Sequence, residues 1–204
     1  MSDIHILFPT PVYQTVIEFR PSELKHMLDF LKACEWRPDM DIVNRPNGET
    51  TKLQEDLLSY PELKLLENNI ENEVHKFAKS LQLDLNKHGL KRINSWGNLQ
   101  RKGNYIKEHR HNNTQFAGVF YLQVPENSGD IVFSTRNATW ITSHWEPSVT
   151  GYDDLNSFEK KFEPEECGLF LFPAHLDHYV TPSFSSEERY SISFNYNLDG
   201  KFFG

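Results

Sequence analysis

Two groups of histidines in the second half of the chain combine residue types and spacings that suit a metal ion. His109 and His111 are two residues apart, so on a β-strand both imidazoles would face the same side. His178 follows the apolar run 169–172, a buried strand that would deliver it at its end. Neutral imidazoles bind Fe, Zn, Cu or Ni. Three protein ligands would leave open positions on the ion, as a catalytic metal requires.

The spacing of His109 and His111 does not establish ligation by itself, because such a pair can also form a solvated strand edge. A third feature favours a site: Arg189 and Ser191 alternate with apolar residues and would project from one face of a strand. A buried guanidinium needs an anionic partner. A bound dicarboxylate could be that partner. A structural ion pair with one of the 29 Asp and Glu residues is the alternative.

Short β-like segments, separated by Gly, Pro and Asn turns, would carry these side chains. We expect strands over 92–100, 104–108, 116–124, 130–133, 168–172, 178–181 and 189–196. Successive strands without helices between them are typical of an antiparallel sandwich or barrel. The long connection 134–166 carries Trp140, His144 and Trp145 and predicts a lid or a mobile segment.

The first 90 residues predict a helical flank on this β core. An extended segment over 4–19 precedes a helix with an apolar stripe from Leu24 to Leu31, and 35–58 is expected to be a loop. Ser59 is the predicted N-cap of a second helix, whose stripe runs from Leu63 to Leu81 and which ends at 86–89. The fold class is therefore mainly β with an α-helical flank, in one domain over 1–204, divided into 1–90 and 91–204.

Composition excludes several classes of function. The net charge of −8 and the lack of a basic stripe argue against nucleic-acid or anionic-membrane binding. No apolar run is long enough to span a bilayer, and no signal peptide is visible. Cys34 and Cys167, the two cysteines, form no metal motif and fit a reducing compartment, so we expect a cytoplasmic protein. The oligomeric state is open, with a homodimer as one option.

In combination, five motifs resemble those of the iron(II)- and 2-oxoglutarate-dependent oxygenases. The motifs are His109-x-His111, Tyr121-Leu122, Gly168…Phe172-Pro173, His178-x-Val180 and Arg189-x-Ser191. The chain looks most similar to the prolyl-4-hydroxylase-like group, and within it to uncharacterised bacterial and phage proteins. The segments 7–13 and 191–195 also look like that set, and the resemblance covers most of the chain.

The resemblance implies a double-stranded β-helix, or jelly roll, that holds one Fe(II). It implies that His109 and His178 are ligands and that Arg189, assisted by Ser191, binds the distal carboxylate of 2-oxoglutarate. Tyr121 and Asn98 are further candidates for contact with this cosubstrate. The expected reaction uses O2 to hydroxylate an unidentified protein or small-molecule substrate, with release of succinate and CO2.

One position departs from the family pattern, which is His-x-Asp/Glu followed by a distal His. His111 occupies the place of the carboxylate. It could ligate iron as a third imidazole, Glu108 or Asp177 could supply a carboxylate, or the site could have lost oxygenase activity and kept binding. We favour the first interpretation, because Glu108 and Asp177 adjoin their histidines at odd offsets and would point away.

Two other functions remain as alternatives. The sequence Gly103 to His111 and the spacing from Pro173 to His178 also resemble the metal motifs of cupins, which could act as isomerases or dioxygenases without 2-oxoglutarate. The Glu ligand usual after the cupin His-x-His is missing, and cupins do not require the Arg189-x-Ser191 pair. A jelly-roll domain without catalytic activity is the second alternative.

Overall fold

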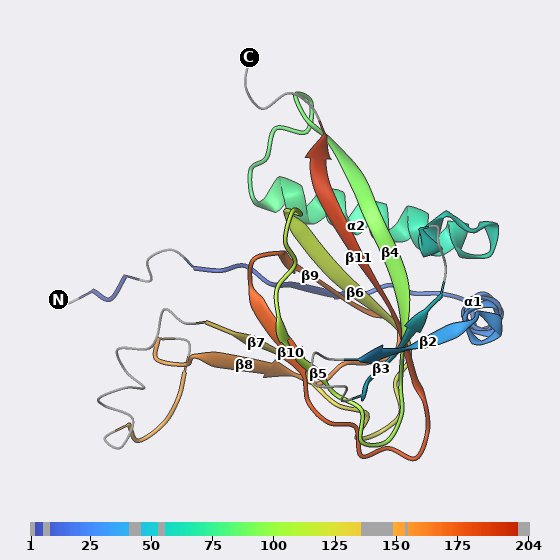
Figure 1. Ribbon diagram of the computed structural model, residues 1–204. Coiled ribbons are helices and arrows are strands. Elements are labelled where there is room, and N and C mark those ends of the chain that lie inside the picture. Colours follow the sequence, from blue (N-terminus) through green and yellow to red (C-terminus); the bar gives the residue numbers. More distant parts are fainter. Residues whose placement is uncertain are drawn as a thin grey trace.

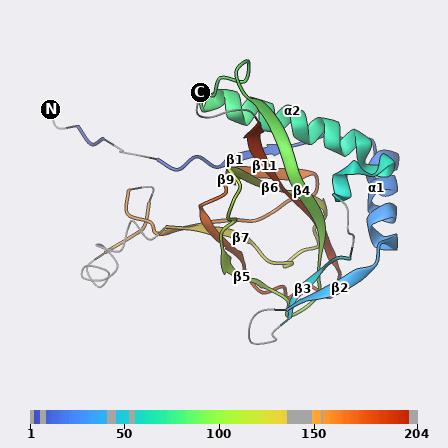
Figure 2. The same cartoon turned by 45° about the horizontal axis from the view of Figure 1, so that its top comes forward.

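The computed structural model describes residues 3–5, 9–40, 46–52, 56–135, 149–153 and 155–199. Its strands form two antiparallel sheets. The larger sheet has the order β1 (Tyr13–Val16), β9 (Gly168–Pro173), β6 (Phe116–Gln123), β11 (Arg189–Asp199), β4 (Gly89–Gln100), β3 (Pro46–Thr51) and β2 (Trp36–Met40). The smaller sheet has the order β5 (Ile106–His109), β10 (Asp177–Val180), β7 (Ile131–Ser134) and β8 (Glu159–Phe162). Helix α2 (Lys64–Ser80) lies along the outer face of the larger sheet, and α1 (Pro21–Ala33) lies beside it (Figure 1, Figure 2).

The two faces of strand β11 separate an apolar helix-side core from a polar interior. Tyr190, Ile192, Phe194 and Tyr196 belong to the core shared with the helices. The residues between them are polar and largely buried: Arg189, Ser191, Ser193 and Asn195. Because side chains alternate across a strand, β11 contributes residues both to the apolar core and to the polar interior. The predicted mainly β fold with a helical flank is confirmed, and the sheets form a jelly roll.

The apolar stripes predicted for the helices face this core. Met27 and Leu31 of α1 and Leu66, Ile70 and Phe77 of α2 are buried in it. Gly118 on β6 belongs to the same layer, and a Cβ there would lie 2.5 Å from ring carbons of Phe194. Only glycine lets the aromatic ring pack this close to the strand.

The predicted ends of the second helix were wrong. The 3-10 turns η1 (Leu57–Ser59) and η2 (Pro61–Leu63) precede it, and the α-helix begins only at Lys64. Ser59 donates its hydroxyl to the carbonyl of Asp56 and so does not cap α2. The helix ends at Ser80, where Gln82 adopts a left-handed backbone conformation with φ of 59°. A left-handed residue after the last turn terminates a helix without glycine.

The loop predicted over 35–58 was also wrong, because strands β2 and β3 pair as a hairpin that extends the larger sheet. Polar residues and prolines hide these strands in the sequence. Pro38 is tolerated because β2 is the outermost strand, where a missing N–H breaks no interior ladder. Gly48 has φ of 115°, and a Cβ there would meet the carbonyl oxygen of Leu99 at 2.8 Å.

The long connection 134–166 contains strand β8, which pairs with β7 and which sequence analysis missed. Its sequence, EKKF, is charged and largely exposed, as is common in edge strands. Trp140, His144 and Trp145 lie outside the described residues, so their predicted role as a lid stays a prediction. In the part of the chain that the structure describes, neither helix has the length and apolar character needed to cross a bilayer.

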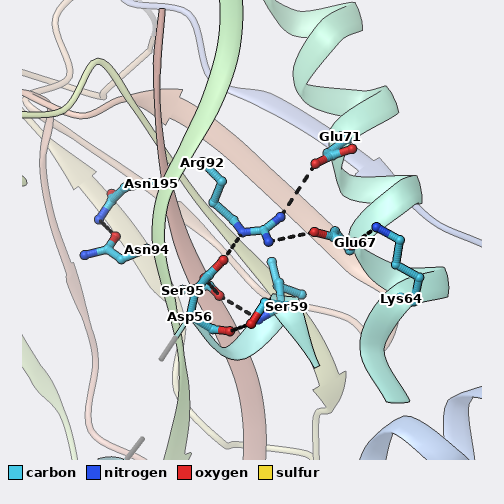
Figure 3. A network of polar contacts seen from close by, with 10 residues as sticks. Asp56, Ser59, Lys64, Glu67, Glu71, Arg92, Asn94, Ser95 and Asn195 are labelled. Atoms are coloured by element: carbon cyan, nitrogen blue, oxygen red, sulfur yellow. Dashed lines mark hydrogen bonds and ion pairs between the residues drawn. The ribbon is translucent and has the colours of Figure 1, made fainter. Parts of the chain in front are cut away.

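A polar network joins α2 to strand β4 on the outer face of the larger sheet (Figure 3). The guanidinium of Arg92 contacts Asp56 at 2.5 Å and Glu67 at 2.7 Å, and its side chain is only 9% exposed. Ser95 donates its hydroxyl to Asp56 and accepts a hydrogen bond of 2.8 Å from the backbone N–H of Leu58. These partners raise the pKa of Arg92 above its ordinary value despite burial, which acts in the opposite direction. The network therefore connects the first half of β4 to helix α2 and stabilises its position.

Arg92→Ala is expected to lower the free energy of unfolding by about 3–5 kcal/mol, because it leaves two carboxylates without their buried partner. Urea denaturation followed by circular dichroism measures this loss. Lys25→Ala is the control, because the Lys25–Asp29 pair is exposed on α1 and contributes little. If Arg92→Ala lowered the free energy of unfolding no more than Lys25→Ala does, the result would contradict a stabilising role for the network.

Candidate metal and cosubstrate site

The three histidines converge because two neighbouring strands and one turn place them together. His109 is the last residue of β5, and His178 on β10 is its direct register partner. His111 lies just beyond β5, where its backbone N–H donates to the carbonyl of Ala174 at 2.9 Å. One ring nitrogen from each residue lies within 4.8 Å of the other two. The predicted convergence of these residues is therefore present in the structure.

Hydrogen bonds set the orientation of all three rings. The Nδ1 atoms of His109 and His178 contact the carbonyl oxygens of Lys107 and Leu176, each at 2.9 Å. The Nδ1 atom of His111 contacts Oδ1 of Asn195 at 2.5 Å. Oxygen acceptors of this kind require Nδ1 to carry the proton, which leaves the Nε2 lone pair free.

The free nitrogens suit a shared cation. The Nε2 atoms of His109 and His111 are 3.4 Å apart. Two unprotonated nitrogens at that distance repel each other unless a cation lies between them. Metal–nitrogen bonds of about 2.0–2.1 Å would place two nitrogens of one ion about 3.0–3.4 Å apart, so the spacing of His109 and His111 fits a shared metal ion.

Burial favours the neutral form of two of the candidate ligands, His178 and His111. It lowers the pKa of His178 to about 3, with further lowering from His109, and it also lowers the pKa of His111. Imidazoles must be neutral to bind a metal, so at neutral pH these two rings need not lose a proton first.

Glu108 and Asp177 point away from the three rings, as their offsets predict. Glu108 accepts a hydrogen bond of 2.5 Å from the hydroxyl of Ser134. Asp177 is held by the guanidinium of Arg110 at 2.8 and 2.9 Å. Among the described residues, no carboxylate joins the group of potential metal ligands. Their positions leave His111 as the residue that stands in the place of the usual carboxylate.

A cavity of about 130 Å³ extends from the histidines into the barrel, and Arg189 lines it. Arg189 is 2% exposed, and its Nη1 donates to the carbonyl of Gly129 at 2.7 Å. Its Nε has no hydrogen-bond partner, and no described carboxylate forms an ion pair with it. Burial lowers the pKa of this guanidinium, and nearby Asp130, itself paired with Lys161, raises it. A buried cation that forms no ion pair with a described carboxylate and lies beside a cavity is suited to an anionic ligand.

The other predicted contacts line the same cavity. Ser191 is the next inward residue on β11, with Tyr121 opposite it on β6 and Asn98 opposite it on β4. The ring of Tyr121 lies 5.6 Å from the guanidinium of Arg189. The amide of Asn98 is already engaged, because it donates to Ser193 at 2.9 Å and accepts from Trp96 at 3.0 Å. Asn98 is therefore less free to bind a ligand than Ser191.

Sequence analysis assigned no role to several residues of the site. Trp96, Ser193 and Asp39 line the cavity, and Asn195 contacts His111. The alternation that identified Arg189 and Ser191 extends to Ser193, and Trp96 is likewise two residues from Asn98, so periodicity could have found both. Asp39 lies on β2, in the segment 35–58 that the sequence predicts as a loop. His175 is exposed and does not belong to the cluster.

The fold and the cavity define a class: a jelly-roll protein with a candidate metal centre and a buried guanidinium on the inner faces of its sheets. Residues 94–195 match the family model described as "Putative 2OG-Fe(II) oxygenase". This match spans half of the chain, and the chain belongs to that family. It is an oxidoreductase that depends on Fe(II) and 2-oxoglutarate.

Solved structures of this class share the fold at low sequence identity. An oxidoreductase of the 2OG-Fe(II) oxygenase family from Burkholderia pseudomallei superposes with a TM-score of 0.66 at 13% identity, over 91% of this chain and 84% of that one. A prolyl-4-hydroxylase from Pseudomonas putida superposes with a TM-score of 0.63 at 17% identity, over 94% of both chains. HygX from Streptomyces hygroscopicus, with nickel and 2-oxoglutarate bound, superposes with a TM-score of 0.61 at 12% identity, over 95% of this chain and 84% of that one. A comparison with curated protein sequences finds no match.

Proposed function

We propose that this enzyme hydroxylates an unidentified substrate with consumption of 2-oxoglutarate and O2 and release of succinate and CO2. His109, His111 and His178 would hold Fe(II) through Nε2. The observation that carries the proposal is the presence of three free imidazole nitrogens and a buried guanidinium without a carboxylate partner in one cavity. When bound, Fe(II) would supply the redox chemistry that couples decarboxylation of 2-oxoglutarate to oxidation of a C–H bond.

The residues of this chain would bind and orient the cosubstrate. Arg189 would pair with the distal carboxylate of 2-oxoglutarate through its free Nε–H, with the hydroxyl of Ser191 assisting. Tyr121 would close that end of the cavity and Asn98 would lie beside it. Ile106, Ile131 and Phe172 also line the cavity and would limit the access of water.

The primary substrate is either a peptidyl side chain or a small metabolite. The structural neighbours include a prolyl hydroxylase in complex with a peptide fragment of a hypoxia inducible factor and HygX with hygromycin B bound. Both kinds of substrate are therefore compatible with this barrel. Trp96, whose ring lies 5.8 Å from that of His111, and Asp39 line the cavity and are the candidates for contact with the substrate.

The experiment that tests the proposal combines anaerobic spectroscopy with product analysis. We expect a new visible absorbance band when 2-oxoglutarate is added to the Fe(II)-loaded protein, and succinate after admission of O2. The Zn(II)-loaded protein is the control and should give neither signal. A protein that binds Fe(II) but shows no response to 2-oxoglutarate would contradict the proposal and favour a barrel that does not use this cosubstrate.

A further inference from the structure

We propose that Asn195 is a positioning residue that keeps His111 in its metal-binding tautomer, and that Asn94 orients Asn195. This inference rests on the proposed metal site. Oδ1 of Asn195 lies 2.5 Å from Nδ1 of His111, and Nδ2 of Asn195 donates to Oδ1 of Asn94 at 2.8 Å. The three side chains thus form one hydrogen-bonded row that ends at the candidate metal centre.

The direction of these bonds decides whether His111 can be a ligand. With the Asn195 amide nitrogen donating to Asn94, its oxygen faces the imidazole and accepts the Nδ1 proton. The reversed orientation of the amides would place the proton on Nε2, pointing at Nε2 of His109, 3.4 Å away. That tautomer has no lone pair on Nε2, the nitrogen that faces the other histidines, so the amide orientation selects the binding state.

His111 differs from the other two histidines in the nature of its acceptor. His109 and His178 use backbone carbonyls, which side-chain substitutions do not remove. His111 lies beyond the end of β5 and depends on a side chain. Asn195 is 7% exposed, so water does not readily replace its oxygen. A change at Asn195 should therefore affect one ligand and leave two intact.

Regular alternation with Trp96 and Asn98 places Asn94 in this row, and an irregularity directly before it in strand β4 turns Arg92 to the opposite face. The register passes from Asn195↔Asn94 to Tyr196↔Arg92, so Ile93 is an extra residue. Residues two apart in a regular strand share a face, but a bulge breaks this rule. Figure 3 shows the result: Arg92 points to the helix and its carboxylates, while Asn94 and Asn195 meet on the other side of β4. The Arg92 network therefore holds the strand at the point where Asn94 must face Asn195.

The test measures binding of Co(II) alone, through its visible absorption, to the apoprotein. We expect Asn195→Ala to raise the dissociation constant for Co(II) about 10–100-fold, the usual effect of removing the hydrogen-bond partner of a ligand. Asn195→Asp restores an oxygen acceptor and should bring the constant back to within a few-fold of wild type. Asn94→Ala should have a smaller effect than Asn195→Ala, because Asn94 is exposed and water can replace part of its role.

Asn197→Ala is the matched control, because Asn197 lies on the same strand but bonds the backbone of Asn113 and Gln115. Unfolding curves of the apoproteins would detect a general loss of structure. The inference is overturned if Asn195→Ala binds Co(II) as tightly as the wild type does, or if Asn197→Ala loses as much affinity for Co(II) as Asn195→Ala. It is also overturned if a folded Asn195→Asp variant fails to recover that affinity. Failure of the wild type itself to bind Co(II) would instead overturn the proposed function.

Discussion

His178→Ala is expected to abolish stable iron binding and leave the barrel folded. The substitution removes one of three nitrogen donors from the centre of the site, and no described carboxylate lies close enough to replace it. The loss of metal affinity should exceed the about 10–100-fold loss expected when only a hydrogen-bond partner of a ligand is removed. The ring of His178 packs against Phe172 at a centroid distance of 4.7 Å, so a loss of stability of about 0.5–3 kcal/mol should accompany the change.

Metal analysis after anaerobic reconstitution with Fe(II) measures this effect. His175→Ala is the matched control, because His175 is exposed three residues away and lies outside the cluster. His111→Asp is the informative companion: it restores the carboxylate of the family pattern and should retain iron if residue 111 is a ligand. An unchanged iron content in His178→Ala would contradict the assignment of the metal site.

Arg189→Ala is expected to weaken binding of 2-oxoglutarate about 30-fold to several thousand-fold. Truncating one partner of a buried, hydrogen-bonded charge pair costs about 2–5 kcal/mol, which corresponds to that range. The guanidinium is buried and forms no ion pair with a described carboxylate, so it would be the main group that neutralises the distal carboxylate of the cosubstrate. Iron binding should be unchanged, because Arg189 is not among the residues that could hold the metal.

Titration of the Fe(II)-loaded protein with 2-oxoglutarate under anaerobic conditions measures this constant. Arg189→Lys should be intermediate, since an ammonium keeps the charge but loses the planar fork of donors. Arg101→Ala is the control, because Arg101 is half-exposed and paired with Glu188 on the surface. Equal affinity for 2-oxoglutarate in the wild type and Arg189→Ala would show that the cosubstrate binds elsewhere.

Periodicity explains why much of the site could be predicted from the sequence. Alternation along 189–196 separates polar from apolar residues, and the structure places Arg189, Ser191 and Ser193 in the cavity and the apolar residues in the helix-side core. The i, i+2 spacing of His109 and His111 predicts a shared side, and the odd offsets of Glu108 and Asp177 predict that they point away. These features depend only on local sequence, so they can be predicted without knowledge of the tertiary structure.

Polar strands at or next to the sheet edges, and the helix cap, could not be predicted in the same way. Strands β2, β3 and β8 are polar or interrupted by proline, and their pairing depends on the neighbours that they meet in the sheets. The N-cap signal at Ser59 was outweighed because 3-10 turns at 57–63 hold Leu57, Leu58 and Leu63 in the core and engage Ser95. Tertiary packing overrode the local signals in each case.

By itself, the sequence determined the kind of protein: a β barrel with a helical flank, three histidines and an arginine of suitable chemistry, and a family pattern with one departure. Tertiary structure alone decided how that departure is supported. Asn195 and His111 are 84 residues apart and meet at 2.5 Å because folding brings β11 of the larger sheet close to the residues that follow β5 of the smaller sheet. Local periodicity encodes the side to which a residue points, but only chain folding decides which residue it meets there.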